Sequence, residues 1–451
     1  MYSTLYRRII FPIMELYKGT KVQQYLKWLN KTQWWSPQQL ENLQNKKLRA
    51  LIKHAYENVP YYHRMFRKLG LKPEDIKTKE DLSKLPILTK EDIKRNYPND
   101  IKAKNYSNKA ILPWSSSGST GEPVQFFRDK LDLSLSWAAA FRGWSWAGYQ
   151  IGDKYATLWG SLITLSEHKK LVKRVLNLLR RNLLLSAFDM TEENLEEYVN
   201  LLIKFNPKFI RGYSQAIFLL ARYLEAASIS DIRPVAVLTT AETLFNDQRK
   251  LIEKQFGCEV YDAYGGGEAP AAAYECEEHI GYHVSAENMI VEFVRDGENV
   301  APGEIGKIVV TNLNSYASPF IRYEMGDVGK PSDEKCPCGR GLPLISSIEG
   351  RINDFVVTPE GKVIHSYFFP GLFKDFYNIK QFQVIQRTVD KLLIKIVAKN
   401  ELTKSEEETI LQKIRGVVGR NMEIEVVQVD SIPPTRSGKR RFVISNVLPP
   451  F

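Results

Sequence analysis

One short segment carries the residue types that a phosphate-binding loop requires. Residues 115–127 read SSSGSTGEPVQFF, so small hydroxyl residues and two glycines precede an apolar run that suits a strand. Glycines let a ligand approach the backbone closely, and consecutive backbone N–H groups form a concavity that binds anions. Hydroxyl groups add further donors. The candidate phosphate ligands are Ser116, Ser117, Gly118, Ser119, Thr120 and Gly121.

A Ser/Gly surface linker is the alternative interpretation of this segment. A linker, however, has little reason to stop at Pro123 and run directly into apolar residues. The segment is not a nucleotide loop of the GxxxxGK[ST] kind either, because Glu122 follows Gly121.

Two acidic residues stand at the ends of predicted strands. Glu268 closes the run AYGGGE, in which glycines free the backbone to approach a ligand, and its carboxylate is placed to hold Mg²⁺ against phosphate. Asp327 follows the run PFIRYEMG, which turns at Gly326. A carboxylate there can accept two hydroxyl groups of a ribose, and a simple turn-forming Asp is the alternative.

Two basic residues could complete a nucleotide site. Arg351, in EGRIND, lies where the sequence pattern changes near residue 350. Its guanidinium could reach a nucleotide hydroxyl or phosphate. Lys439 lies in IPPTRSGKRRFVIS, a basic loop before the last predicted strand. By itself this loop is a solvated turn, so its interpretation depends on the other motifs.

Cysteines and histidines in two further loops have the spacing of metal ligands. Cys276-x-x-His279 and Cys336-x-Cys338 each offer two ligands, which together predict one tetrahedral, structural Zn²⁺. Separate free thiols are the alternative. Four protein ligands would close the site, so catalytic zinc is not expected. The spare candidates, for which core roles are favoured, are His283 and Cys258.

Aromatic residues offer walls for a flat substrate pocket. Trp137 and Phe141 lie in residues 131–146, a Trp-rich run that predicts a buried helix, and core packing is the favoured explanation for each of them. Tyr213 and Gly266 lie at or just beyond the ends of predicted strands and join the candidate pocket.

The middle of the chain alternates strands and helices in an order that would position these groups. Strands are predicted at residues 209–213, 234–240 and 258–264, with helices at 214–226 and 246–256. This β-α-β-α-β order predicts a doubly wound α/β sheet that binds its ligand at the carboxyl ends of the strands. The residues at those ends are Glu242, Tyr264, Gly265 and Glu268.

The final third of the chain changes character twice. Its hydrophobic period falls to two, which predicts an antiparallel, barrel-like subdomain over about residues 285–350. Two strands, a helix and another strand then predict a separate α+β domain. The expected domains are residues 1–350 and residues 351–451.

Composition and charge bound the class of protein. A chain of 451 residues with 43% hydrophobic content predicts a globular protein of two or more domains. Its net charge of +11 suits an anionic partner such as a nucleotide, a CoA-like carrier or an acidic membrane surface, whereas no nucleic-acid-binding motif is present. The sequence contains no apolar run long enough to span a membrane and no secretory signal. Four cysteines indicate a reducing compartment, the cytoplasm.

Two basic segments each have two interpretations. Residues 1–35 mix aromatic and aliphatic residues with Lys and Arg, as a segment resting on the inner face of a membrane would. We favour instead a helix pair packed against the body of the protein. Residues 166–185 predict a helix with a basic face, which is either solvated or in contact with acidic lipid or a polyanion.

Taken together, the motifs resemble those of the adenylate-forming, acyl-CoA synthetase superfamily. SSSGSTGEP, YGGGE, YEMGD, GRIND and the C-terminal SGK occur in the order and approximate spacing of that superfamily. More narrowly, the chain resembles the phenylacetate–CoA ligase family, and within it the branch often found in capsule and polysaccharide gene clusters, through GRINDFVVTPEGKVIH and KQFQVIQ. The resemblance covers about residues 36–445.

The resemblance implies a fold and a reaction. The fold is a large N-terminal domain of doubly wound α/β sheets with a small β-barrel, followed by a small, mobile C-terminal α+β domain. The reaction is activation of a carboxylic acid by ATP and Mg²⁺ as an acyl-adenylate, with release of pyrophosphate and transfer of the acyl group to CoA. The loop at residues 116–121 would hold the ATP phosphates and Glu268 the Mg²⁺.

The remaining site residues take roles from the same resemblance. Glu242 and Tyr264 would lie near the adenine. Asp327, assisted by Arg351, would hold the ribose hydroxyls. Lys439 would neutralise charge between the substrate carboxylate and the α-phosphate.

The chain departs from the family pattern at three positions. Gly267 stands where Ser or Thr usually precedes the magnesium ligand, Glu122 replaces a common Lys, and Asn353 replaces Asp or Lys at the hinge. Two further hypotheses therefore stand beside the CoA ligase. One transfers an acyl or aminoacyl group to an amine or hydroxyl acceptor in polysaccharide biosynthesis, and the other is a catalytically retired nucleotide-binding protein. The retained Lys439 argues against retirement.

Overall fold

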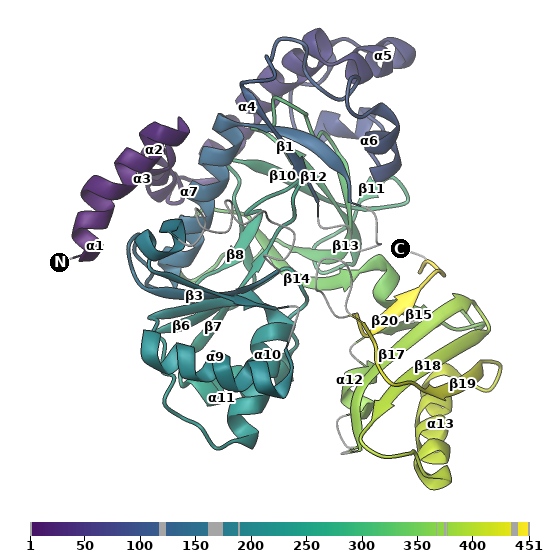
Figure 1. Ribbon diagram of the computed structural model, residues 1–451. Helices are drawn as coiled ribbons and strands as arrows, with labels where there is room; N and C mark the ends of the chain where they lie inside the picture. The colour runs from purple at the N-terminus through teal and green to yellow at the C-terminus, as the bar shows by residue number, and fades with distance from the viewer. Residues whose placement is uncertain are drawn as a thin grey trace. The chain divides into compact units, whose positions relative to one another are not determined.

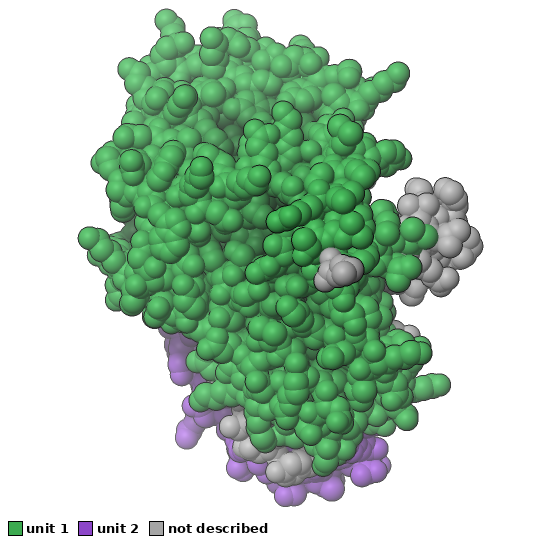
Figure 2. All heavy atoms as spheres, turned by 90° about the vertical axis from the view of Figure 1, so that its left-hand side faces the viewer, with its two compact units in different colours: residues 1–325, 329–348 green, residues 326–328, 349–451 purple. Residues whose placement is uncertain are grey.

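The chain divides into two compact units, each with its own core. In this computed structural model the first unit comprises residues 1–325 and 329–348, and the second residues 326–328 and 349–451 (Figure 2). The expected division after residue 350 stays a prediction about independent domains. The residues that the structure describes are 2–116, 123–160, 175–187, 190–366, 368–373, 376, 378–433 and 441–449.

Among the helices at the start of the chain, two begin at capping groups that the sequence supplies. Ser36 accepts a hydrogen bond from the Gln39 backbone N–H at 3.3 Å, and the Gln39 side chain accepts one from the Ser36 N–H at 2.9 Å, which caps α4. Thr89 and Asp92 form the same arrangement before α6. These elements are α1 (Tyr2–Leu5), η1 (Tyr6–Ile10), α2 (Phe11–Lys18), α3 (Val22–Thr32), α4 (Pro37–Asn58), α5 (Pro60–Leu69) and α6 (Lys90–Asn96).

A parallel block of five strands occupies one end of a twelve-stranded sheet. Its neighbours run in the order β4-β3-β5-β6-β7. Side chains of these strands point alternately to the two faces of the sheet, and each face carries an apolar layer. On one face, Ile210, Val237 and Val260 pack under α9, α10 and α11. On the other face, Phe209 and Tyr261 pack under α7; Figure 1 shows these helices. The elements are α7 (Lys130–Trp146), β3 (Tyr155–Trp159), β4 (Asn182–Ser186), α9 (Glu192–Phe205), β5 (Phe209–Tyr213), α10 (Ser214–Ala226), β6 (Ala236–Thr240), α11 (Asn246–Phe256) and β7 (Glu259–Tyr264).

The antiparallel strands expected at residues 285–350 continue this same sheet. Its order beyond β7 is β8-β9-β14-β13-β12-β10-β11, so the parallel and antiparallel blocks meet at two very short strands, β8 and β9. The elements are β8 (Ala273–Glu275), β9 (Tyr282–Val284), β10 (Met289–Arg295), β11 (Glu298–Asn299), β12 (Gly306–Asn312), β13 (Tyr323–Ser332) and β14 (Leu344–Arg351). A separate hairpin is formed by β1 (Ile111–Ser115) and β2 (Gln125–Asp129).

The second unit is an α+β structure around a four-stranded sheet. The sheet order is β19-β18-β17-β20, and α13 contributes Ile410 and Ile414 to its core. Thr403 caps α13 together with Glu406. The elements are β15 (Phe355–Val357), β16 (Val363–His365), α12 (Phe368–Phe373), β17 (Ile379–Thr388), β18 (Lys391–Ala398), α13 (Lys404–Val418), β19 (Glu423–Gln428) and β20 (Val443–Ser445).

One predicted helix is wrong at its C-terminal end. The helix expected over residues 166–185 gives way to strand β4, whose Leu183 to Leu185 pair with residues of β3. A short apolar run satisfies a helix and a buried strand equally well, so the neighbouring strand decides. Residues 161–174 lie outside the described part of the chain. Across the described residues, no helix combines the length and apolar character needed to cross a bilayer.

Candidate functional site

The predicted phosphate loop is closed at its neck by a pair of hydrogen bonds. The Ser116 N–H donates to the Val124 carbonyl at 2.9 Å, and the Val124 N–H donates to Ser116 Oγ at 3.0 Å. These bonds follow directly on the β1–β2 ladder, which runs up to the pair of Ser115 with Gln125. Five of the predicted phosphate ligands lie outside the described residues: Ser117, Gly118, Ser119, Thr120 and Gly121.

The glycine run after β7 makes a tight turn against this hairpin. The Gly266 N–H donates to the Ala269 carbonyl at 3.1 Å, and a β-carbon at Gly265 would lie only 3.0 Å from that same oxygen. A β-carbon at Gly267 would lie 3.2 Å from Ser116 Cα. The structure therefore brings Ser116 and the glycine run together, and Gly267 lacks a side chain where the two backbones approach closely.

Glu268 follows the glycine run and is held firmly. Its side chain is buried, its Oε1 accepts a hydrogen bond from the Tyr323 hydroxyl at 3.1 Å, and its carbonyl accepts one from Asn312 Nδ2 at 3.3 Å. Asn312 Nδ2 also donates to Asp132 Oδ1 at 3.3 Å, which links the turn to α7. A buried carboxylate fixed in this way offers oxygen atoms of the kind that Mg²⁺ prefers.

Glu242 has a structural role that sequence reasoning did not identify. Its Oε2 accepts a hydrogen bond from the Gln215 N–H at 3.1 Å, and its carbonyl accepts one from the Ser214 hydroxyl at 3.0 Å. The carboxylate therefore stabilises the N-terminus of α10, where the helix dipole favours negative charge. Tyr264, the last residue of β7, lies half-buried next to Gly265. The adenine-binding roles of Glu242 and Tyr264 stay predictions.

The structure brings together the two residues expected at the ribose. Arg351 Nε lies 2.7 Å from Asp327 Oδ1 within the second unit. Gly326, just before the acidic residue, has φ +74°, and a β-carbon there would lie 3.3 Å from Arg351 Nη1. Asp327 is buried, so the guanidinium compensates a charge that would otherwise be costly.

Lys439 lies outside the described residues. The chain that follows it is anchored, because Arg441 Nη2 lies 2.5 Å from Asp354 Oδ1 and Arg441 Nε donates to the same oxygen at 3.2 Å. Asp354 belongs to η4 (Ile352–Asp354), next to Arg351.

The four predicted pocket residues fall into two groups. Phe141 packs against Phe11 of α2 and against Trp137, with ring centroids 5.9 and 5.7 Å apart, so Phe141 belongs to the packing of the N-terminal helices. The Trp137 side chain is 43% exposed, so the core role favoured for it is wrong. Tyr213 instead packs on Trp159 at the carboxyl ends of β5 and β3, with centroids 4.5 Å apart. Burial raises the pKa of Tyr213 to about 12. Gly266 is the fourth predicted pocket residue, in the turn after β7.

Arg211 is a candidate pocket residue that sequence reasoning missed. Its guanidinium lies between two indole rings, 4.5 Å from the centroid of Trp144 and 5.1 Å from that of Trp159. Burial lowers its pKa, and no acidic side chain among the described residues pairs with it. The signal was available in the sequence, since an Arg at the centre of the apolar strand FIRGY needs a reason.

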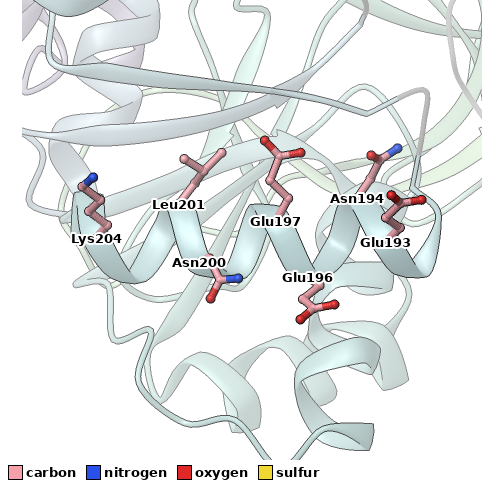
Figure 3. A pocket seen from close by; sticks show the side chains of 7 residues that line it. All are labelled: Glu193, Asn194, Glu196, Glu197, Asn200, Leu201 and Lys204. Atoms are coloured by element: carbon pink, nitrogen blue, oxygen red, sulfur yellow. The ribbon is translucent and has the colours of Figure 1, made fainter.

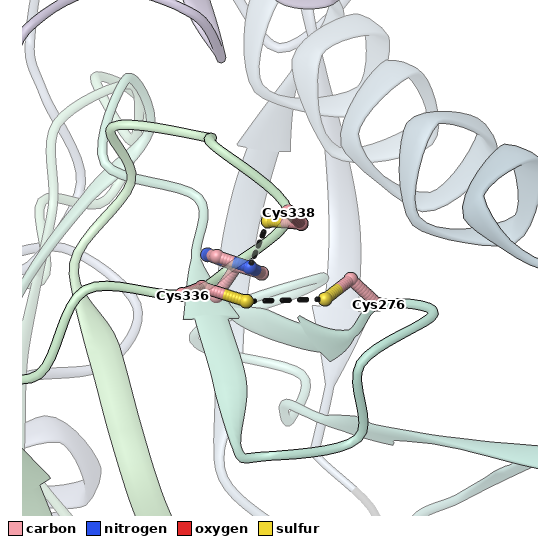
Figure 4. Close-up of side chains that lie close together, drawn as sticks. Cys276, Cys336 and Cys338 are labelled. Atoms are coloured by element: carbon pink, nitrogen blue, oxygen red, sulfur yellow. Dashed lines mark hydrogen bonds between the residues drawn. The ribbon is translucent and has the colours of Figure 1, made fainter.

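The predicted zinc ligands are corrected at one position, because His283 rather than His279 joins the three cysteines. The ligand atoms of this Cys/His cluster all lie within 4.8 Å of one another. The cysteine side chains converge from two loops, one with Cys276 and the other with Cys336 and Cys338 (Figure 4). The members of the cluster are Cys276, His283, Cys336 and Cys338.

The reason for the correction is local backbone geometry. His279 sits in a turn with φ +51°, and its Nδ1 lies 3.4 Å from Glu275 Oε2. That contact raises the pKa of His279. His283 lies on β9, is fully buried, and has a pKa that burial lowers to about 4, so its imidazole is neutral. Cys258, the other spare candidate, stands apart from the cluster.

A surface depression of about 440 Å³ lies over α9 and is not part of this site (Figure 3). Its lining is acidic and polar, and it belongs to a single helix rather than to the carboxyl ends of the strands. An anionic nucleotide does not fit such a surface. The lining residues are Glu193, Asn194, Glu196, Glu197, Asn200, Leu201 and Lys204.

Comparison with solved structures defines the class of fold. 2-Hydroxyisobutyryl-CoA ligase in complex with an acyl-AMP matches with a TM-score of 0.72 at 19% identity, over 90% of this chain and 89% of that chain. ATP-bound MatB from Rhodopseudomonas palustris matches with a TM-score of 0.52 at 15% identity, over 73% of this chain and 66% of that chain. The fold is that of the adenylate-forming CoA ligases.

Sequence comparison defines the relatives. Residues 356–446 match the CapK C-terminal domain. Protein CapK of Staphylococcus aureus is 27% identical over 423 residues, which cover 90% of each chain. Phenylacetate-coenzyme A ligase of Escherichia coli K12 is 28% identical over 438 residues, 92% of this chain and 97% of that enzyme. This chain is a homologue of CapK and of the phenylacetate–CoA ligases, as the motifs predicted.

Proposed function

We propose that this chain is an ATP-dependent, AMP-forming acid–thiol ligase. It activates a carboxylic acid as an acyl-adenylate, releases pyrophosphate and passes the acyl group to the thiol of CoA. The observation that carries the proposal is the close approach of Ser116, at the neck of the phosphate loop, to Gly267, directly before buried Glu268. Homology to phenylacetate–CoA ligases over nearly the whole chain supports the same reaction class.

The first unit supplies the phosphate side of the site in this proposal. The loop at residues 116–121 binds the β- and γ-phosphates through backbone N–H and hydroxyl groups. Glu268 is the Mg²⁺ ligand, held in position by the Tyr323 hydroxyl. When bound, Mg²⁺ would lower the repulsion between the phosphates and the incoming carboxylate. Glu242 and Tyr264 contact the adenine.

Asp327, Arg351 and Lys439 supply the remaining groups in this proposal. Asp327 accepts hydrogen bonds from the ribose hydroxyls, and its ion pair with Arg351 orients the carboxylate for them. Lys439 brings a positive charge to the point where the substrate carboxylate meets the α-phosphate. The difficulty of the reaction is that two anions must meet, so positioned positive charge does most of the work and little acid–base chemistry is needed.

The zinc expected from the sequence takes no part in this reaction. Four protein ligands would leave no open coordination position for substrate. Acyl transfer is the step in which the homologues can differ. Transfer to an amine or hydroxyl group is the alternative to transfer to CoA, and the experiment below distinguishes the two.

Carboxylate-dependent exchange of labelled pyrophosphate into ATP tests the first half-reaction. The purified chain is assayed with a panel of aliphatic, aromatic and amino acids, with omission of the acid as the control. Exchange with at least one acid is expected, and the best acid identifies the substrate class. CoA or a simple amine is then added with that acid, and mass spectrometry is expected to detect the CoA thioester. Absence of exchange with every acid would contradict the proposal. Formation of an amide in place of the thioester would show that the acyl group is transferred to an amine rather than to CoA.

For localisation, we propose a cytoplasmic enzyme that rests on the inner face of the membrane through its N-terminal helices. A cytoplasmic position suits an enzyme that uses ATP and CoA and whose four cysteines form no disulfide. The supporting feature is an apolar stripe on α1 to α2 that faces solvent. We call this set the N-terminal stripe; its members are Leu5, Ile9, Ile13, Leu16 and Tyr17.

A further inference from the structure

The Cys/His cluster lies at the seam where the parallel and antiparallel blocks of the sheet meet. Cys276 directly follows β8, and His283 lies on β9. Cys336 and Cys338 lie in the loop between β13 and β14. Because β14 pairs with β9, through Leu344 opposite His283, this loop returns to the sheet beside the other two ligands. Four residues from three segments of chain therefore converge on one point.

Two distances between ligand atoms are close to the edges of a tetrahedral metal site. Cys276 Sγ lies 3.6 Å from Cys336 Sγ, and Cys338 Sγ lies 3.3 Å from His283 Nε2. Bonds of about 2.3 Å to sulfur and about 2.0 Å to nitrogen give tetrahedral edges of about 3.8 Å between sulfurs and about 3.5 Å between sulfur and nitrogen. A disulfide would instead need sulfurs about 2.0 Å apart. The cysteines are free thiols in metal-binding geometry.

The surroundings orient the ligands. His283 Nδ1 lies 3.4 Å from the Leu342 carbonyl, which can only accept, so Nδ1 carries the proton and Nε2 presents its lone pair to the cysteines. Such a carbonyl partner is the usual support of a metal-binding imidazole. The turn that contains the last two cysteines is also preorganised. Gly339, which has φ +81°, donates its N–H to the Cys336 carbonyl at 3.1 Å.

Arg340 supplies a positive charge beside the cluster. Three thiolates and one neutral imidazole around a divalent cation leave a net negative charge, which a neighbouring guanidinium offsets. Arg340 is held there by Glu277, with both carboxylate oxygens 3.0 Å from Nη1, and by the rings of Trp34 and Trp146.

We propose that Cys276, His283, Cys336 and Cys338 bind one structural Zn²⁺ that fastens the seam of the twelve-stranded sheet. Thiolate and imidazole ligands select zinc among the abundant divalent cations. Strands β8 and β9 have three residues each, so their own ladders make few hydrogen bonds. The metal also fixes the loop of Gly341, whose N–H donates to the Gln33 carbonyl at 2.9 Å, against the junction of α3 and α4.

Metal analysis of the purified chain tests the proposal without reference to activity. The wild type, loaded with Zn²⁺ and dialysed, is expected to retain about one zinc ion per chain by mass spectrometry. His283→Ala is expected to lose it, because one of the four ligands is removed. His279→Ala and Cys258→Ser are the matched controls, and both are expected to keep the metal.

A spectroscopic measurement on the wild type covers the case in which His283→Ala fails to fold. Co²⁺ substituted for Zn²⁺ is expected to show the visible bands of a tetrahedral ion and thiolate charge-transfer bands. A zinc-loaded wild type that holds no metal, or a Co²⁺ form without thiolate bands, would overturn the proposal. Retention of zinc by His283→Ala together with its loss from His279→Ala would overturn the ligand set.

Discussion

At the scale of single residues, Gly267 shows how a departure from a family pattern can be a packing requirement. A β-carbon there would lie 3.2 Å from Ser116 Cα, a distance at which the hairpin carrying the phosphate loop must shift by a few tenths of an ångström. A serine or threonine at this position, as in the family pattern, would require a slightly wider gap between the two backbones. The missing hydroxyl and the close approach of Ser116 are therefore linked.

This link predicts the effect of Gly267→Ala. The added methyl group displaces Ser116 and with it the phosphate loop, so KM for ATP is expected to rise by about 3- to 10-fold, because small misplacements are costly in preorganised sites. Gly416→Ala is the control, since a β-carbon there meets nothing within 4 Å. Steady-state kinetics with saturating acid measure the effect. An unchanged KM for ATP in Gly267→Ala would show that the approach to Ser116 is irrelevant to nucleotide binding.

Residue types and spacing predicted the acidic and basic candidates but not the fourth ligand of the Cys/His cluster. The ion pair of Asp327 with Arg351 joins two residues that were both predicted to hold the ribose hydroxyls. His279, in contrast, has the spacing of a metal ligand, yet its turn directs it to Glu275. Only the pairing of β9 with β14 places His283 beside the cysteines, and sequence spacing carries no information about such long-range pairing.

At the scale of elements, the N-terminal stripe gives a second experiment. Ile13, Leu16 and Tyr17 are 61%, 84% and 91% exposed, although the same helical segment buries Tyr6 against the protein. Arg7, Arg8 and Lys18 are exposed beside them. An exposed apolar stripe flanked by basic residues suits the interface of an anionic membrane.

Co-sedimentation with lipid vesicles measures this association. Binding to vesicles that contain phosphatidylglycerol is expected to exceed binding to pure phosphatidylcholine and to weaken as salt is raised. Leu16→Ser/Tyr17→Ser is expected to reduce binding several-fold, whereas Leu69→Ser/Val235→Ser, at exposed positions elsewhere, is expected to leave it unchanged. Equal binding by the two double variants would remove the N-terminal stripe as the contact.

The elements themselves were predictable wherever local signals agreed. Residues 214–226 and 246–256 were predicted as helices with the bounds that α10 and α11 have, because apolar periodicity marks both segments and Gly257 ends the second. The predicted helix over residues 166–185 failed where β4 begins, since Leu183 to Leu185 carry no period of their own. Residues 285–350 were expected to form a barrel-like subdomain of the N-terminal domain, and their strands extend the main sheet. Which strands pair is a property of the partners rather than of any one strand.

At the scale of the whole molecule, the proposed reaction draws on residues from distant parts of the sequence. Ser116 and Glu268 are proposed for the phosphates and Mg²⁺, and the ion pair of Asp327 with Arg351 for the ribose. Lys439 is proposed for the reacting carboxylate. Our central claim is that these separate groups act on one molecule of ATP to overcome the repulsion between a carboxylate and a phosphate.

Single-turnover formation of the acyl-adenylate, with the preferred acid and ATP, tests this claim most directly. Glu268→Gln and Lys439→Ala are each expected to slow the step by about 10²- to 10³-fold, because each removes a charge aimed at the reacting phosphates. Lys391→Ala, a surface lysine of the second unit that pairs with Glu423, is the control and should match the wild type. Adenylate formation at the wild-type rate in both site variants would contradict the account.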